Sequence, residues 1–179
     1  PTFDGPSVGV DRPTDVVYAR RTMAKNRVLE ELEKRSTELH AEIPSAKQSE
    51  VFAAAIEAGY LTAIADGTLD DEERVALARA IELLSKGAVI EWETDALLEG
   101  CAARAKDKGA KARAEEVGRS LAASGQAEAG LLVGAIVACA TNGVDKTEAD
   151  TLKQVAKAAG VSSDKLRGIV KRAAGFAGT

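Results

Sequence analysis

The chain has 179 residues, enough for one domain with its own hydrophobic core. Apolar residues make up 45% of it and charged residues 29%, a balance typical of folded soluble proteins rather than disordered ones. With 35 alanines, 3% aromatic residues and a single histidine, His40, the composition predicts an all-α protein and excludes histidine triads and multi-histidine zinc sites.

The net charge of −4 is unevenly distributed, because residues 1–48 sum to 0, residues 49–100 to −9 and residues 101–179 to +5. The acidic and basic parts are expected either to attract each other within the fold or to present two faces of opposite sign to partners. The basic residues near Arg104 and Arg113 have acidic neighbours and no interleaved aromatic residues, which indicates a solvated helix face rather than a nucleic-acid site. No apolar stretch is long enough to span a bilayer and no signal peptide is visible, so a cytoplasmic location is expected.

Residues 1–13 form an extended tail that contains three prolines and two glycines. Its apolar residues are Phe3, Val8 and Val10. A segment of this composition is ordered only when something holds it, so these three side chains are predicted to contact a protein partner.

Residues 14–44 are predicted to form a long N-terminal helix, because no Gly or Pro interrupts the stretch from Val16 to Ile43. Its apolar positions make a narrow stripe, which is typical of a helix that packs along another helix. The stripe consists of Val28, Leu32, Leu39 and Ile43.

Residues 45–179 are predicted to form a helical bundle. Residues 51–65 are almost wholly apolar and are expected to be its central helix, with Tyr60 buried. Further helices are expected from Asp70 to Ser85, from Thr94 to Lys108, from Gly109 to about Ser124, from Ala127 to Ala140, from Asp145 to about Gly160, and from Ser162 or Ser163 onward. The thiols of Cys101 and Cys139 lie in Ala-rich stretches without metal-binding or redox spacing, so both are expected to be buried and free.

Trp92 is the only tryptophan and is predicted to lie in the loop before Thr94. It either anchors this loop on the core or contacts a protein partner, since tryptophan is enriched at binding hot spots.

One supersecondary unit occurs twice, 75 to 76 residues apart. Each copy has an Ala-rich helix, an Asp-Gly or Asn-Gly turn, an Asp-x-x-Glu cap and an amphipathic helix, at residues 63–73 and again at 138–148. The repetition predicts a pseudo-symmetric bundle of two helix-turn-helix repeats.

The paired turns resemble those of the tellurite-resistance TerB-like family, and the resemblance covers about residues 45–172. The second turn has Asn142 where the family has Asp. The resemblance implies an all-α fold, a link to bacterial stress responses and a divalent-metal site built from acidic residues.

Asp66, Asp70 and Glu73 follow one another at steps of four and three, so their carboxylates are candidate ligands for Ca²⁺ or Mg²⁺. Asp145 and Glu148 would add ligands if the two turns meet. The same residues also suit helix capping, because Asp70 and Asp145 stand at N-cap positions and each glutamate stands three positions later. Both interpretations remain open at this point.

These features predict a non-catalytic TerB-like protein-binding module of a bacterial stress-response or envelope-associated complex, tuned by a divalent metal. The alternative is a structural subunit of a larger bacterial assembly, docked through the tail and the long N-terminal helix. A carboxylate enzyme is disfavoured, because the sequence has no Gly-rich phosphate loop and no nucleophile with an accompanying base.

Overall fold

The computed structural model describes residues 48–67, 69, 71–85, 89, 91–139 and 146–176. Over these residues the chain forms seven α-helices and no strand, which confirms the all-α prediction. They are α2 (Gln48–Ala63), α3 (Asp71–Ser85), α4 (Glu91–Lys108), α5 (Ala110–Ser124), α6 (Ala127–Cys139), α7 (Lys146–Ala158) and α8 (Ser163–Phe176). The predicted tail at 1–13 and the predicted helix at 14–44 lie outside the described residues. In the described part, none of the helices has the length and apolar character that crossing a membrane would require.

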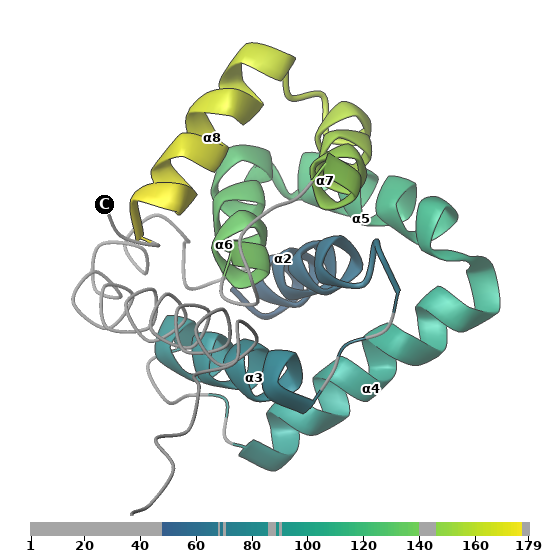
Figure 1. Cartoon of the computed structure of the whole chain (residues 1–179). Coiled ribbons are helices and arrows are strands. Elements are labelled where there is room, and N and C mark those ends of the chain that lie inside the picture. The colour runs from purple at the N-terminus through teal and green to yellow at the C-terminus, as the bar shows by residue number, and fades with distance from the viewer. Residues whose placement is uncertain are drawn as a thin grey trace, which may run out of the picture.

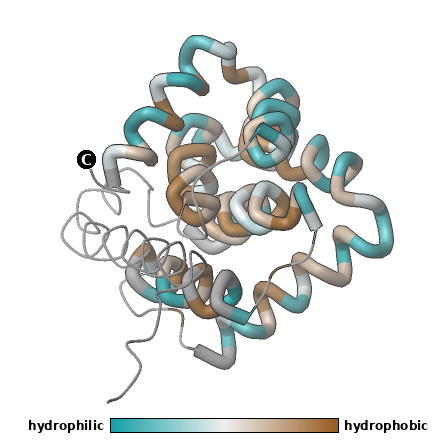
Figure 2. Tube along the Cα trace, viewed as in Figure 1, coloured by the Kyte–Doolittle hydropathy of each residue, from teal (hydrophilic) through white to brown (hydrophobic). Residues whose placement is uncertain are grey.

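Helices α2 and α6 form the centre of the bundle, and the other described helices surround them (Figure 1). Every residue of α6 from Gly130 to Cys139 is buried. Helix α2 buries Ala55, Ile56 and Leu61 completely, which confirms the expected central helix, and Tyr60 is buried as predicted. Figure 2 shows hydrophobic positions concentrated on α6 and α2, as the apolar sequence of both helices requires.

The two central helices approach each other closely where Gly59 of α2 meets Gly134 of α6. A Cβ atom at Gly59 would lie 2.9 Å from the carbonyl oxygen of Gly134, and one at Gly134 would lie 3.0 Å from the carbonyl oxygen of Ala55. Since any larger residue would push the backbones apart, this crossing depends on glycine in both helices.

The outer helices bury one face each. Helix α5 packs against α7 and α2, while α8 packs against α6. In α7 the buried positions include Leu152 and Val155, and in α8 they include Leu166 and Ile169, so apolar residues recur at steps of three. Helix α3 packs against α4 and α6 and places Leu77 and Ile81 in the core.

The glycines that follow α4, α5 and α7 have a positive φ, a region of backbone space that favours a residue without a side chain. Gly109 has φ of +84° and separates α4 from α5, as predicted. Gly160 has φ of +72° after α7, where its N–H donates to the Lys157 carbonyl at 3.1 Å and the N–H of Val161 donates to the Ala156 carbonyl at 2.9 Å. This pair of bonds is a Schellman motif and satisfies the carbonyls at the end of α7.

Two helices differ from their predicted boundaries, since α2 runs over Gln48–Ala63 rather than residues 51–65 and α4 starts earlier than expected. Helix α4 begins at Glu91, so Trp92 lies in its first turn rather than in a loop, and Thr94 lies inside the helix rather than at its N-cap. The acidic Glu91 and Glu93 favour this earlier start, because negative charge stabilises the first turn of a helix. The hydroxyl of Thr94 is buried without a hydrogen-bond partner in the described part of the chain.

Candidate functional site

A buried carboxylate joins three helices. Glu57 of α2 has a side chain that is only 5% exposed, and both of its oxygens accept hydrogen bonds from arginines. Nε of Arg113 in α5 donates to Oε1 at 2.8 Å, and Nε of Arg104 in α4 donates to Oε2 at 3.0 Å. Because a buried charge is costly unless it is paired and hydrogen-bonded, these contacts let α2 keep a carboxylate within an apolar sequence.

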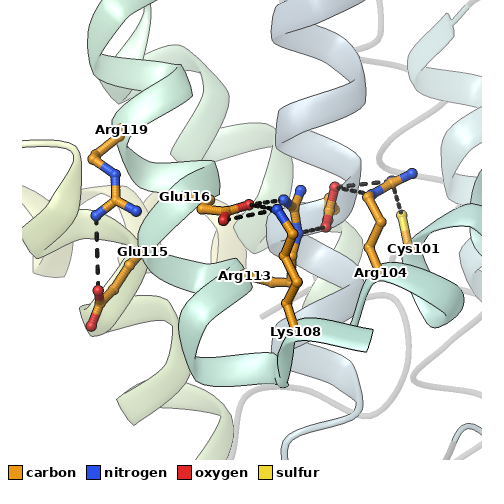
Figure 3. A network of polar contacts seen from close by, with 8 residues as sticks. Cys101, Arg104, Lys108, Arg113, Glu115, Glu116 and Arg119 are labelled. Atoms are coloured by element: carbon orange, nitrogen blue, oxygen red, sulfur yellow. Dashed lines mark hydrogen bonds and ion pairs between the residues drawn. The ribbon is translucent and has the colours of Figure 1, made fainter. Parts of the chain in front are cut away.

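The ion pairs of Glu57 continue through Arg113 to a second carboxylate, that of Glu116 (Figure 3). Arg113 also bonds Glu116, and Nζ of Lys108 lies 3.0 and 3.1 Å from the two oxygens of the same carboxylate. The hydrogen bond from Lys108 is the main cause that lowers the pKa of Glu116 below its ordinary value. We call these five residues the Glu57 cluster: Glu57, Arg104, Lys108, Arg113 and Glu116. The cluster holds the corner where α4 meets α5 against α2.

Hydrogen bonds to Glu57 keep the arginines of this cluster charged, although burial by itself favours the neutral form. The hydrogen bond to Glu57 is the main cause that raises the pKa of Arg104 and that of Arg113 above the ordinary guanidinium value. The Arg113 side chain is 13% exposed, whereas that of Arg104 is 42% exposed. Arg113 is therefore the more strongly confined of the two partners of Glu57.

Cys101 lies beside this cluster, with its Sγ atom 3.4 Å from Nη2 of Arg104. Burial, with a smaller contribution from the Glu57 charge, raises the pKa of the Cys101 thiol to about 12. The thiol is therefore neutral at neutral pH and is not an activated nucleophile. The prediction of buried free thiols is confirmed for both Cys101 and Cys139. Burial and the charge of Glu148 raise the pKa of the Cys139 thiol to about 11.

A cleft of about 490 Å³ opens next to the Glu57 cluster between α2 and α5. Buried Ala54 and Val117 lie on its apolar side, and exposed Glu50 and Ser120 lie at its edge. Its charged wall consists of groups that already pair with each other, so these side chains give the cleft a fixed surface.

The predicted metal ligands are described only in part. Asp66 is exposed after the end of α2, and Glu148 is buried in the first turn of α7. Glu73 lies in the first turn of α3, where only its backbone is described. Asp70 and Asp145 lie outside the described residues. Among the described side chains, no group of three His, Cys, Asp or Glu residues is placed to hold a metal ion.

The predicted partner contacts are also outside the description. Phe3, Val8 and Val10 lie outside the described residues, and for Trp92 only its backbone position in α4 is described. The five candidate metal ligands and these four candidate partner contacts therefore stay predictions.

Sequence reasoning missed the Glu57 cluster and took Arg104 and Arg113 as part of a solvated helix face. The structure corrects this for Arg113, whose guanidinium is mostly buried against Glu57. A signal was present, because Glu57 is the only charged residue between positions 51 and 65. A lone carboxylate in a buried helix requires a cation from another element.

Comparisons with family models, with curated proteins and with solved structures found no match to this chain.

Proposed function

We propose that this protein is a non-catalytic, TerB-like protein-binding module of a bacterial stress-response or envelope-associated complex, tuned by a divalent metal. The Glu57 cluster carries the proposal. Its charges hold α2, α4 and α5 in fixed positions, and a recognition surface built on rigid elements binds a partner at a lower entropic cost than a mobile one.

The two-repeat architecture belongs to the same proposal. Gly59 and Gly134 meet at the crossing of the central helices and stand 75 positions apart, which is also the separation between the first residues of α3 and α7. This common offset supports a duplicated unit in which α2 and α3 correspond to α6 and α7.

Protein binding is tested by photo-crosslinking followed by hydrogen exchange. A photo-reactive amino acid is placed at exposed Ala112 of α5 in the full chain within the native host, and the captured partner is purified and recombined with the unmodified protein. Protection from exchange on α5 and its neighbours is expected in the complex. Protection confined to residues 1–44 would instead favour the assembly subunit docked through its tail and long helix.

The metal part of the proposal has its own test. Ca²⁺ or Mg²⁺ that binds the folded state is expected to raise the melting temperature measured after chelator treatment. Asp66→Asn removes one proposed ligand at an exposed position and is expected to abolish the increase. If neither ion changes the melting temperature, the acidic residues serve as helix caps and the metal part of the proposal is wrong.

A further inference from the structure

We propose that a groove between α5 and α7 binds an acidic peptide segment of the partner protein. The inference rests on the proposed protein-binding function and names the surface that carries it. The groove has a volume of about 590 Å³, within the usual range for binding pockets. We call it the basic groove; it is lined by Lys111, Glu115, Arg119, Gln154, Lys157 and Ala158.

The geometry of the two helices places the cations together. Lys111, Glu115 and Arg119 follow at steps of four and share the exposed face of α5. Helix α7 lies beside α5 (Figure 1), and the two approach closely at Gly118, where a Cβ atom would lie 2.4 Å from the Val155 carbonyl oxygen. This close approach brings Lys157 of α7 to the same groove as the cations of α5.

The groove has an excess of positive charge, with three cations and one carboxylate. Neither Lys111 nor Lys157 lies within ion-pair distance of a carboxylate in the described part of the chain. Arg119 contacts Glu115 at 3.8 Å, and both side chains are more than half exposed (Figure 3). Such a long, exposed pair is weak, so a carboxylate from a partner can replace it at little cost.

The residues of the groove favour an acidic peptide over a nucleic acid. Carboxylates of Asp and Glu pair with lysine ammonium groups and accept two hydrogen bonds from an arginine. The amide of Gln154 adds a donor and an acceptor that suit a peptide backbone. None of the described residues that line the groove is aromatic and could stack on a base, and Glu115 would repel a continuous phosphate backbone.

The test measures binding of a fluorescein-labelled peptide of Glu, Asp and Gly to the full chain by fluorescence anisotropy. The double variant Lys111→Glu with Lys157→Glu is expected to weaken binding about tenfold or more, because two attractive contacts become repulsive. The control variant Lys106→Glu with Lys171→Glu changes the net charge equally at exposed sites on α4 and α8 and is expected to stay within about twofold of the wild type. Thermal melts of all three proteins show whether each is folded.

Three results would overturn the proposal. They are the absence of peptide binding, an equal loss in both double variants, and tighter binding of a single-stranded oligonucleotide that the groove variant abolishes. The photo-crosslinked partner separates this proposal from the general function. If the groove variant still forms that complex, the module binds its partner through another surface and only the assignment of the groove fails.

Discussion

Arg113 and Glu57 are 56 positions apart in the sequence, yet Nε of the arginine lies 2.8 Å from a carboxylate oxygen that is almost entirely removed from water. The contact fastens α5 to the central helix α2. Because each group is costly to bury without the other, the stability of this corner depends on the pair rather than on either residue.

Glu57→Gln is expected to lower the free energy of unfolding by about 2 kcal/mol, since it removes the buried counter-charge of Arg113 and leaves this arginine paired with Glu116 alone. The loss is smaller than for a fully buried pair because Arg104, at 42% exposure, can turn toward water. Urea denaturation measures the effect. Glu115→Gln is the matched control, because its exposed pair with Arg119 contributes less than about 0.5 kcal/mol. Equal losses in the two variants would contradict the structural role of Glu57.

Two Gly→Ala substitutions are expected to have opposite effects. At Gly118 a new Cβ would lie 2.4 Å from the Val155 carbonyl oxygen, and the clash is expected to destabilise the protein by about 1–3 kcal/mol. At Gly168 of α8 a Cβ meets nothing within 4 Å, so alanine is expected to stabilise the protein by about 0.5–1 kcal/mol through its higher helix propensity. Thermal or urea unfolding gives both signs, and a destabilising Gly168→Ala would show that α8 is packed differently.

Both cysteines are expected to resist thiol reagents in the native protein. With a pKa of about 12, about one Cys101 thiol in ten thousand is ionised at pH 8, and burial blocks access to it as well. Labelling is expected to be at least about a thousandfold slower in buffer than in denaturing urea, where both thiols are exposed. Stopped-flow absorbance with a chromogenic disulfide measures the rates. Rapid labelling of the native chain would contradict the buried position of the thiols.

The ion pair of Glu116 predicts a pH-dependent contribution to stability. Its lowered pKa in the folded state means that the contribution is present above the ordinary glutamate pKa of about 4.3 and is lost as the pH falls through the lower folded value. Glu116→Gln is therefore expected to melt below the wild type at pH 7 and close to it near pH 3. Circular dichroism melts across this range measure the difference, and a constant difference would contradict the pairing with Lys108.

The helix boundaries that depend on local signals could be predicted from the sequence. Gly109 and Ser124 bound α5 as expected, and Ser162 is the N-cap of α8, because its Oγ accepts a hydrogen bond from the Lys165 N–H at 3.4 Å. The predicted start of α4 was wrong. Thr94 is a good N-cap by residue type, but the acidic residues before it favour three more helical positions.

The candidate site could not be predicted in the same way. Glu57 is 47 positions from Arg104 and 56 from Arg113, so their meeting depends on how α4 and α5 pack on α2. No local spacing rule connects residues on three helices. The basic groove has the same origin, since Lys111 and Lys157 become neighbours only through the close crossing at Gly118.

The glycines at the helix crossings also limit how this sequence can diverge. In alanine-rich helices one small residue can replace another with little loss of packing, so most positions of α2, α5 and α6 tolerate substitution. Gly59, Gly118 and Gly134 cannot, because a Cβ at each would lie 3.0 Å or less from a backbone oxygen of a neighbouring helix. Distant relatives are therefore expected to retain the spacing of these three glycines after the alanines between them have changed.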